Sequence, residues 1–584
     1  MRKTKIICTL GPAADNEAMI TALAENGMNV ARLNFSHGDY EEHKRRIDLV
    51  KKVRAKLKKP IGIMLDTKGP EIRIREFACD TVEMKEGAEF TLTTRDVEGD
   101  ETIVSVTYKD LPKELKAGDM VLIDDGLVGL KVKKIKGQDI LCDVMNSGTL
   151  SGKKSINLPG ISVSMPYLSD KDQKDILFGI ENNVDFIAAS FTRTASDILE
   201  IKKILAKNNG TDIQVIAKIE NMEGVNNIED IIRESDGIMV ARGDMGVEIP
   251  MEELPAIQKM LIKKCYLAGK KVITATQMLD SMIRNPRPTR AETTDVANAV
   301  YDGTSALMLS GETAVGKYPV ESVQTMAKIA LSTEQSIDYK KIFEEVHIDF
   351  ETNVTNAISH ATCMTAHDLG AVAILTVSRS GHTARMVSKY RPACPIICGT
   401  PIEKVYCQLS MSWGVTPIMS EEKYTTDDLF DHVTELAKEN GYVSDGDIVV
   451  ITGGVPVGVS GTTNILKVHL VGNILVQGTG IGKSGAVGNI CVADTEEEAL
   501  KLFENGDILV ISSTSNNLLP IIKNAKGLIV EEEGTACHAA IVGLALDIPV
   551  ITGAKGAVKL LRSGSTITMD CQRGLVISGA ASML

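Results

Sequence analysis

Short apolar runs alternate with longer amphipathic stretches at the start of the chain. The runs Thr4–Leu10, Asn29–Leu33 and Ile61–Leu65 are each bounded by turn residues and followed by polar or helix-like sequence. Continuous apolar runs of this length between helices are typical of parallel strands that are covered on both faces. Residues 1–69 are therefore predicted to hold three strand–helix units.

The pattern changes over residues 70–166, where the helical period fades. Val, Ile and Thr alternate with charged residues, and the turn pairs Gly118-Asp119, Asp125-Gly126 and Pro159-Gly160 interrupt the stretch. Alternation with a period of two, broken by glycine and proline, indicates short antiparallel strands. A small β-barrel domain inserted into the first unit is predicted here.

The alternation of strands and helices resumes over residues 167–341. Five further strand candidates are Val184–Ala189, Ile213–Ile219, Gly237–Ala241, Lys271–Ala275 and Ser305–Leu309. Three units before the insertion and five after it make the eight of a (β/α)₈ barrel, the TIM barrel fold. A doubly wound open sheet stays possible, because periodicity alone does not show whether a sheet closes.

Two more α/β segments follow. Residues 342–473 contain strand candidates at Ala371–Val377, Ile448–Thr452 and Lys467–Val471. Residues 474–584 begin with the glycine-rich run GTGIGKSGAVG and continue with strands such as Ile508–Ile511 and Leu528–Val530. We expect each segment to be a separate domain.

Composition narrows the classes of function. The 584 residues correspond to about four domains of roughly 150 residues. A net charge of −13 and an aromatic content of 4% argue against a nucleic-acid partner, which needs positive charge and stacking platforms. The eleven scattered cysteines suggest buried thiols in a reducing, cytoplasmic setting. No secretory leader and no membrane-spanning segment are expected.

Polar side chains lie at the ends of six of the eight strand candidates. Reactive groups in a (β/α)₈ barrel project from the C-terminal strand ends, where residues i and i+2 share a face. Lys218 and Glu220 alone could be a structural ion pair, but six such sets at one barrel mouth indicate bound ions and an anionic substrate. The sets are Arg32, Asn34 and Ser36; Asp66 and Lys68; Lys218 and Glu220; Arg242 and Asp244; Thr274 and Thr276; Ser310 and Glu312.

The residue types indicate the chemistry. Glu220 and Asp244 are hard oxygen ligands without nearby His or Cys, which suits Mg²⁺ or Mn²⁺. Arg32, Lys68 and Lys218 suit phosphate, and the backbone amides that follow Arg242 suit a carboxylate. The set Asn34, Ser36, Asp66 and Thr67 carries one full negative charge, which fits K⁺ better than a second divalent ion. The residues thus predict a metal-assisted enzyme that acts on a phosphorylated carboxylate.

The motifs ARLNFSHG, LDTKGPEIR, IAKIEN, ARGDMGVE, ATQMLDSM and MLSGETAVGKYP together resemble pyruvate kinase over residues 1–472. The resemblance implies transfer of the phosphoryl group of phosphoenolpyruvate to ADP, giving ATP and pyruvate. It also implies Mg²⁺ or Mn²⁺ and K⁺ as cofactors and a cytoplasmic homotetramer. The implied fold is the barrel, the inserted lid domain and an α/β regulatory domain.

The resemblance implies a role for each matching residue. Glu71 fits the K⁺-dependent version of its motif. Thr276, Ser310 and Glu312 could form a water-linked relay that protonates the enolate, or Ser310 and Glu312 could only support the site. The other implied roles are substrate binding by Arg32, Lys218, Gly243, Asp244 and Thr276; divalent-metal binding by Glu220 and Asp244; K⁺ binding by Asn34, Ser36, Asp66 and Thr67; and nucleotide binding by Arg73 and Lys154.

The segment AILTVSRSGHTARMVSKYRP reads as a strand, a Ser/Gly loop and a helix start. Ser378, Ser380, Gly381, His382 and Thr383 could hold a phosphate, although an ordinary capped helix is the alternative. The segment resembles the site where pyruvate kinases bind a phosphorylated activator, a sugar phosphate or AMP. The loop GGVPVGVSGTTN could close such a site.

The run EEEGTACHAAIVGLALDIPVITG resembles the swivelling phosphohistidine domain of enzymes such as pyruvate phosphate dikinase, an extra domain of Bacillus-type pyruvate kinases. The usual pattern is G-G-x-T-S-H-A-A, and Ala536 and Cys537 replace its Thr and Ser while His538 is retained. We therefore expect a structural role for His538. Two rival functions are a dikinase-like phosphotransferase that works through His538 and a catalytically silent sensor of phosphorylated metabolites.

Overall fold

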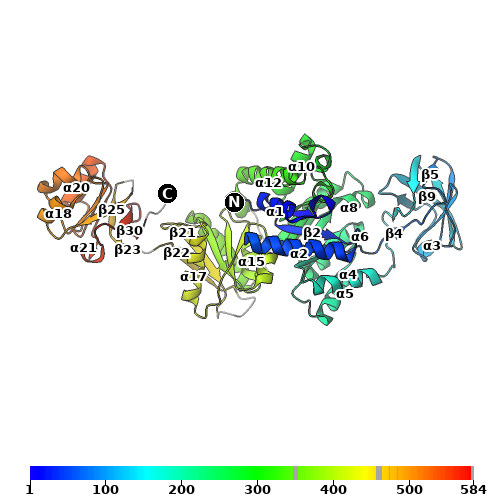
Figure 1. The fold of residues 1–584 in the computed structure, drawn as a ribbon, viewed down its shortest axis with the longest axis horizontal. Helices are drawn as coiled ribbons and strands as arrows, with labels where there is room; N and C mark the ends of the chain where they lie inside the picture. The colour runs from blue at the N-terminus through cyan, green and yellow to red at the C-terminus, as the bar shows by residue number, and fades with distance from the viewer. Residues whose placement is uncertain (346–352, 456–462, 473, 483–484, 580–584) are drawn as a thin grey trace. The chain divides into compact units, whose positions relative to one another are not determined.

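The computed structural model describes residues 1–345, 353–455, 463–472, 474–482 and 485–579 (Figure 1). The chain forms two compact units. The first contains Met1–Glu351, Arg379–Ala393 and Thr400–Met419, and the second contains Thr352–Ser378, Cys394–Gly399 and Ser420–Leu584. Among the described helices, none combines the length and the apolar character that crossing a bilayer requires.

Eight parallel strands of the first unit close into a barrel in the order β1-β17-β16-β15-β14-β13-β3-β2. Each observed strand overlaps one predicted strand, and the closed barrel excludes the open doubly wound sheet. The strands are β1 (Lys5–Thr9), β2 (Val30–Asn34), β3 (Gly62–Asp66), β13 (Phe186–Ala189), β14 (Gln214–Ile219), β15 (Gly237–Ala241), β16 (Lys271–Ala275) and β17 (Ala306–Leu309).

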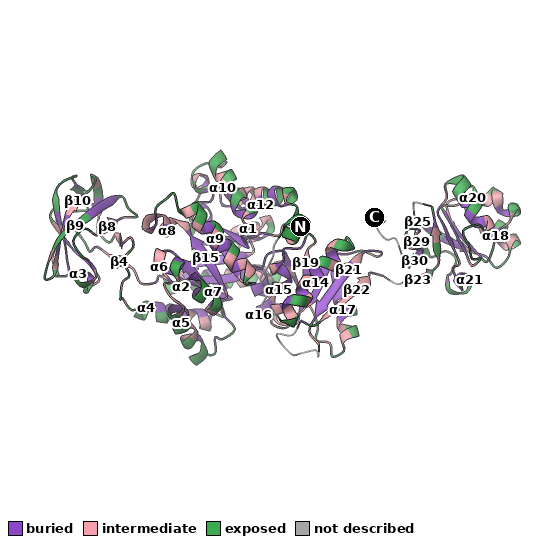
Figure 2. Cartoon of the chain, turned by 180° about the vertical axis from the view of Figure 1, so that it is seen from behind, coloured by how far each residue is buried: buried purple, intermediate pink, exposed green. Residues whose placement is uncertain are grey.

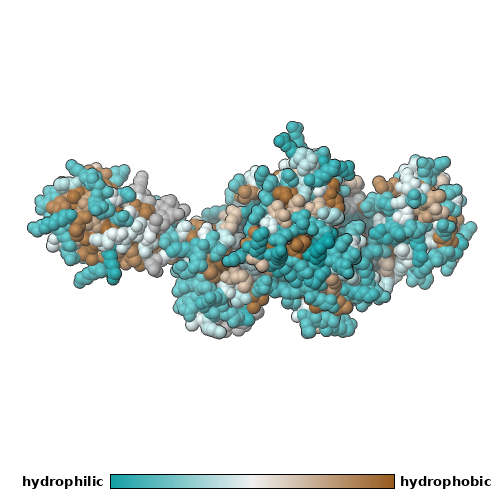
Figure 3. Space-filling view, in the orientation of Figure 1, coloured by the Kyte–Doolittle hydropathy of each residue, from teal (hydrophilic) through white to brown (hydrophobic). Residues whose placement is uncertain are grey.

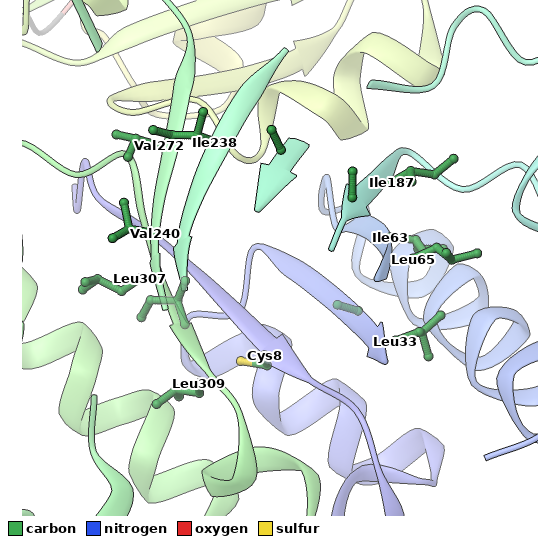
Figure 4. Close-up of a cluster of buried hydrophobic side chains, with 14 of the residues drawn as sticks. Cys8, Leu33, Ile63, Leu65, Ile187, Ile238, Val240, Val272, Leu307 and Leu309 are labelled. Atoms are coloured by element: carbon green, nitrogen blue, oxygen red, sulfur yellow. The ribbon is translucent and has the colours of Figure 1, made fainter. Parts of the chain in front are cut away.

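Alternate residues of the barrel strands pack on opposite faces. Cys8, Leu33 and Leu65 belong to a cluster that the surrounding helices cover (Figure 4), whereas Ile7 and Met64 belong to a separate cluster of the barrel interior. Because both faces are covered, the strands are uniformly buried and read as continuous apolar runs (Figure 2). Burial in these two clusters explains why the apolar runs in the sequence predicted the positions of the strands closely.

The helices around the barrel begin at well-formed caps. Ser169, Thr194 and Thr289 each form a capping box with an acidic residue three positions later. Caps of this kind satisfy amide groups that a helix leaves without partners at its start. The covering helices include α1 (Glu17–Asn26), α2 (Tyr40–Leu57), α4 (Asp170–Glu181), α5 (Ala195–Lys207), α7 (Ile228–Glu234), α9 (Leu254–Leu267), α10 (Arg290–Tyr301) and α12 (Pro319–Ser336).

The insertion between β3 and α4 is a β-domain, as predicted. Its larger sheet has the strand order β4-β12-β8-β9-β10-β6-β7, and β11 (Gly148–Ser151) pairs with β5 (Thr81–Met84). A separate apolar core includes Phe90, Leu130 and Ile140. The larger sheet contains β4 (Ile72–Arg73), β6 (Glu89–Thr93), β7 (Ile103–Ser105), β8 (Met120–Ile123), β9 (Val128–Lys136), β10 (Asp139–Val144) and β12 (Ser155–Asn157).

The α/β segment that follows contains the strands β18 (Ala373–Val377), β21 (Ile448–Gly453) and β22 (Ile465–Leu470) at the predicted places. In the second unit, β18 pairs in parallel with β19 (Ile396–Thr400) and β21, and β22 runs antiparallel to β21. Helices α14 (Val354–Asp368) and α17 (Thr426–Glu439) also belong to this unit. Helix α15 (His382–Lys389), helix α16 (Glu403–Leu409) and strand β20 (Val415–Met419) belong to the first unit.

The last part of the chain forms a sheet with the strand order β23-β30-β29-β25-β26-β27-β28-β24. Its central parallel strands β25 (Ala486–Val492), β26 (Ile508–Ile511), β27 (Gly527–Val530) and β28 (Val550–Thr552) alternate with short helices. Helix α20 (His538–Leu546) exposes Ile541 and Leu544, and hydrophobic side chains are visible on the surface of this part in Figure 3. The remaining strands are β23 (Ile474–Gln477), β24 (Thr479–Ile481), β29 (Thr566–Asp570) and β30 (Leu575–Ser578).

Candidate active site

Four charged side chains meet at the C-terminal ends of β2, β3 and β14. Arg32 Nε lies 2.6 Å from Asp66 Oδ2, and Lys218 Nζ lies 3.1 Å from Asp66 Oδ1 and 3.0 Å from Glu220 Oε1. All four residues are buried, with Asp66 fully enclosed. Buried ions are stable only when they are paired, so the network of Arg32, Asp66, Lys218 and Glu220 forms one electrostatic unit.

Neighbouring charges and burial determine the protonation of this unit. Burial would raise the pKa of Asp66, but Arg32 and Lys218 outweigh it and hold that pKa below its ordinary value. Burial would lower the pKa of Lys218, but Asp66 and Glu220 raise it, so the ammonium stays charged at neutral pH. Burial raises the pKa of Glu220, and nearby Asp244 raises it further. The site therefore presents two cations, Arg32 and Lys218, beside the carboxyl groups of Asp66, Glu220 and Asp244.

The turn after β13 also belongs to this site, and the sequence analysis missed it. Ser190 Oγ accepts a 2.7 Å hydrogen bond from Lys218 Nζ and lies 3.1 Å from Asp66 Oδ1 and 2.7 Å from the Thr67 carbonyl oxygen. The Phe191 amide donates to Glu220 Oε2. The sequence did contain a sign of this contribution. Ser190 and Thr192 come directly after the strand candidate Val184–Ala189 and have the same i, i+2 spacing as the other strand-end sets.

Phe191 holds a left-handed backbone conformation with φ of 54°. This conformation costs a residue with a Cβ atom about 1–2 kcal/mol. In this turn the Ser190 hydroxyl contacts Lys218, and the Phe191 amide donates to the Glu220 carboxylate. Backbone strain beside two charged site residues is typical of positions where geometry is imposed for function.

Glu220 and Asp244 fit a hard divalent cation. Asp244 lies in the first turn of α8 (Arg242–Glu248) and forms no ion pair with another described residue, although its charge affects both Lys218 and Glu220. No cluster of three or more His, Cys, Asp or Glu side chains suited to a metal exists in the described part of the chain. Two carboxylates without His or Cys suit Mg²⁺ or Mn²⁺, which keep several water or substrate ligands.

The residues predicted to bind K⁺ lie at or just beyond the C-terminal ends of β2 and β3. Asn34 Oδ1 accepts a 3.1 Å hydrogen bond from the Ser36 amide, and Ser36 is exposed. The Thr67 hydroxyl accepts from the Ser190 amide at 3.2 Å, and its amide donates to the Ala188 carbonyl. The donor set consists of oxygen atoms with one carboxylate, Asp66, which fits a weakly charged cation.

The start of α8 faces Thr276. The Gly243 amide donates to Thr276 Oγ1 at 2.7 Å, and the Thr276 hydroxyl donates to the Ala275 carbonyl at 2.6 Å. Arg242 instead pairs with Asp295 at 2.7 Å and donates to the Thr276 carbonyl. The structure thus brings the Gly243 amide, next to Asp244, into contact with the Thr276 hydroxyl.

Glu312 is held by the backbone. Its carboxylate accepts from the Leu279 amide at 3.0 Å and from the Ser310 amide at 2.7 Å, and burial raises its pKa. The Ser310 hydroxyl is buried without a hydrogen-bond partner. These contacts favour the supporting role for Glu312. Thr274 was also predicted to lie at the barrel mouth. Its hydroxyl instead donates to the Thr304 hydroxyl at 2.9 Å and does not reach the mouth.

A cleft of about 680 Å³ separates the β-domain from the barrel. Its lining contains Arg73 and Lys154 on the β-domain side and Phe191 and Asp244 on the barrel side. Arg73 pairs with Glu71 at 2.7 Å and Lys154 with Asp124 at 3.0 Å, while Lys68 lies 4.0 Å from Glu71. Both predicted nucleotide contacts therefore line one cleft beside the charged network.

The predicted effector residues divide between the two units. Ser378 belongs to the second unit, where its amide donates to the Gly399 carbonyl at 3.1 Å. In the first unit, Gly381 caps α15 with φ of 70°, His382 and Thr383 begin the helix, and Arg385 donates to the Ser380 carbonyl at 2.9 Å. Most of the loop GGVPVGVSGTTN lies outside the described residues.

His538 is the first residue of α20. Its Nδ1 lies 2.9 Å from Thr514 Oγ1, and its Nε2 lies 3.1 Å from Asn516 Oδ1. Ala536 and Cys537 lack the hydroxyl groups of the usual motif, but Thr514, from a different segment of the chain, places a hydroxyl next to the ring. Both ring nitrogens are therefore engaged by other side chains of the protein.

Three family models cover most of the chain. The barrel domain of pyruvate kinase matches residues 1–323, its alpha/beta domain matches 356–469, and the mobile domain of PEP-utilising enzymes matches 503–574. The chain belongs to the pyruvate kinase family. It is an enzyme, a phosphotransferase, and the resemblance inferred from the motifs is confirmed, including the additional last domain.

Individual relatives agree with this assignment. The pyruvate kinases of Sporosarcina psychrophila and Geobacillus stearothermophilus are each 50% identical to this chain, and the comparison covers 100% of both chains. The crystal structure of a pyruvate kinase from Cryptosporidium parvum is 41% identical with a TM-score of 0.78, covering 80% of this chain and 96% of that chain. Membership of the family thus extends over the whole length of the sequence.

Proposed function

We propose that the enzyme transfers the phosphoryl group of phosphoenolpyruvate to ADP, giving pyruvate and ATP. The observation that carries this proposal is the buried network of Arg32, Asp66, Lys218 and Glu220 at the barrel mouth. Its cations are held in place by carboxylates before any substrate arrives. Phosphoryl transfer depends mainly on such prearranged charge, because the transferring group carries its charge on peripheral oxygens.

Arg32 and Lys218 would bind the phosphoryl group in this reaction. Lys218 would also stabilise the negative charge that develops on the enolate, since its pKa is raised and the ammonium keeps its proton. The Gly243 and Asp244 amides and the Thr276 hydroxyl would receive the substrate carboxylate. Arg73 and Lys154 would contact the nucleotide phosphates in exchange for their present carboxylate partners.

Two cations would complete the site. Glu220 and Asp244 would hold Mg²⁺ or Mn²⁺, and Asn34, Ser36, Asp66 and Thr67 would hold K⁺. Bound cations at these places offset the repulsion between two polyanionic substrates. Ser190 contacts Asp66, which belongs to the K⁺ set, and Lys218, which pairs with Glu220 of the divalent-cation set. It would therefore hold the two sets of ligands in a fixed relative position.

Protonation of the enolate would involve Thr276, the predicted relay member that directly contacts α8. Its hydroxyl already bridges the Gly243 amide and the Ala275 carbonyl. Ser310 would bind a water through its buried hydroxyl, which has no protein partner. Glu312 would hold this segment in place through its two backbone contacts.

We also propose activation of a cytoplasmic homotetramer by a phosphorylated metabolite. The proposed contacts are Ser378, Ser380, Gly381, His382 and Thr383. The start of α15 directly after Gly381 supports this proposal, because the first amides of a helix have no acceptor within the helix and attract an anion. Initial rates with AMP and with sugar phosphates would identify the activator, and sedimentation would give the oligomeric state.

The central test follows pyruvate formation from phosphoenolpyruvate and ADP. We expect turnover that needs a divalent cation and that falls when tetramethylammonium replaces K⁺. Absence of turnover with every effector would overturn the proposal and favour a silent sensor. A requirement for AMP and pyrophosphate with loss of activity in His538→Ala would favour the dikinase instead.

A further inference from the structure

A small hollow lies at the N-terminal end of the barrel, opposite the catalytic mouth. It forms where β16 and β17 begin and where residues of α15 complete its lining. All of its residues belong to the first unit. The lining is strongly basic and includes Lys270, Lys271, Arg385, Lys389, Arg391 and Ser412.

Arg391 is enclosed between aromatic rings. Its guanidinium carbon lies 4.5 Å from the centre of the Trp413 ring and 5.2 Å from that of Tyr266, and the residue is only 7% exposed. One nitrogen, Nη2, donates to the Gly303 carbonyl at 2.8 Å. Nε and Nη1 are buried and have no hydrogen-bond partner. A guanidinium with two unsatisfied buried donors is costly, because those donors have lost water without gaining an acceptor.

Two lysines near Arg391, Lys270 and Lys271, have neutral hydrogen-bond partners. Lys270 donates to the Ser235 carbonyl at 2.6 Å and Lys271 to Gln214 Oε1 at 2.6 Å. Among the described ion pairs, none includes Lys270, Lys271 or Arg391, and Asp236 and Glu334 act on them only from a distance. Burial lowers the pKa of Lys271 to about 7 and that of Arg391 to about 10. Lys271 and Arg391 are thus buried without an ion pair to any described carboxylate, a costly arrangement for cationic groups.

Ser412 provides a second unsatisfied group in the same hollow. It is 2% exposed, and its hydroxyl has no hydrogen-bond partner. The space between the lining side chains is about 10 Å³, enough for a single water-sized species. A water molecule would satisfy the hydrogen bonds but would leave the charge unbalanced.

We propose that the hollow binds one small inorganic anion of the size of chloride, held by Arg391 and the Ser412 hydroxyl. Such an anion would accept hydrogen bonds from Arg391 and Ser412 and would balance the charge of Lys270 and Lys271. It would stabilise the packing of α15 on the starts of β16 and β17, at the end of the barrel opposite the catalytic mouth. Arg385 of the lining also donates to the carbonyl of Ser380, one of the proposed effector residues. Phosphate or sulfate would fit only if the lysine side chains moved outward.

The single tryptophan of the chain makes this site observable without any substrate. Trp413 is 3% exposed and stacks on Arg391, so it is shielded from quenchers in bulk solvent. Bromide titrated into the full-length protein at constant ionic strength, with gluconate as the balancing anion, should quench its fluorescence in a saturable manner. Chloride should reverse the quenching. Linear, weak quenching that chloride does not affect would overturn the proposal, and competition by phosphate but not chloride would overturn the assigned size.

Two serine variants separate binding from general packing. Ser412→Ala should weaken bromide binding about 3- to 10-fold, as expected for the loss of one hydrogen bond. Ser410→Ala is the matched control, because its hydroxyl is also buried and unpartnered but does not line the hollow. Equal bromide affinities in Ser412→Ala and Ser410→Ala would refute the role of Ser412. Because fluorescence is read without phosphoenolpyruvate or ADP, this result is independent of the proposed catalytic reaction.

Discussion

Lys218 Nζ donates a 2.7 Å hydrogen bond to Ser190 Oγ, which joins the catalytic candidate of β14 to the turn after β13. The same hydroxyl lies within 3.1 Å of Asp66 and 2.7 Å of the Thr67 carbonyl, and its one proton can serve only one of these acceptors. Lys218 is therefore oriented by three oxygen atoms, from Ser190, Asp66 and Glu220. This arrangement leads to the first two predictions.

Lys218→Met should lower kcat by at least about 100-fold, because a prearranged cation at the developing charge is lost. Binding of phosphoenolpyruvate, measured by calorimetry without ADP, should weaken far less, since Arg32 stays paired with Asp66. The matched control is Lys264→Met, which removes a surface lysine paired with Glu229. A Lys218→Met enzyme with wild-type kcat would contradict the proposed role.

Ser190→Ala should lower kcat about 10-fold and change the KM for phosphoenolpyruvate little, because the ammonium remains but loses one of its three oxygen partners. The K⁺ concentration for half-maximal activity should rise, since Ser190 also contacts Asp66 and Thr67. Ser235→Ala is the control, a buried serine whose hydroxyl has no hydrogen-bond partner. If Ser190→Ala matched this control in both kcat and K⁺ response, the positioning role would be wrong.

Phe191→Gly should be more stable than Phe191→Ala by about 1 kcal/mol. Both variants remove the ring, but only glycine adopts the observed φ of 54° without strain. Urea unfolding midpoints of the two variants give the comparison. An alanine variant as stable as the glycine variant would show that this turn is relaxed in solution.

The pH dependence of stability should include a contribution from Lys5. Its ammonium is buried beside the Val415 carbonyl, and burial, reinforced by Arg2, lowers its pKa from 10.5 to about 7. Between these values the unfolded chain binds more protons than the folded chain, so this group adds stability as pH rises from about 7 to 10.5. Below pH 7 the folded state keeps a buried charge and that stability is lost.

The measurement compares the wild type with Lys5→Met by urea unfolding at pH 7 and pH 10. Other titrating groups cancel in the difference between the two proteins. The variant should gain stability relative to the wild type at pH 7 and lose that advantage at pH 10. A difference that did not change with pH would mean that Lys5 keeps its ordinary pKa.

His538→Ala should leave kcat and the KM for phosphoenolpyruvate within about twofold of the wild type. The ring nitrogens are engaged by Thr514 and Asn516, and the motif lacks its usual Thr and Ser. The expected effect is a modest loss of stability in the last domain, from two missing hydrogen bonds. Loss of turnover would instead support phosphotransfer through this histidine.

The sequence alone determined the strands of the barrel and the chemistry of its mouth. Strands buried on both faces must be continuously apolar, so β1, β15 and β16 stand out in a single sequence. Charged residues at the C-terminal ends of such strands, such as Arg32 and Glu220, cannot be buried without partners. Their presence therefore indicated bound ions and an anionic substrate. The remaining assignments of roles came from the family resemblance of whole motifs.

Only the tertiary structure decided which of these residues touch. Closure of the sheet places β13 between β3 and β14, and this neighbourhood lets Ser190 contact both Asp66 and Lys218. The backbone contacts of Glu312, the hydroxyl that Thr514 supplies to His538, and the stacking of Arg391 on Trp413 likewise join segments distant in sequence. Periodicity reports which face of an element is buried, whereas the partners of a buried polar group depend on how the elements are packed together.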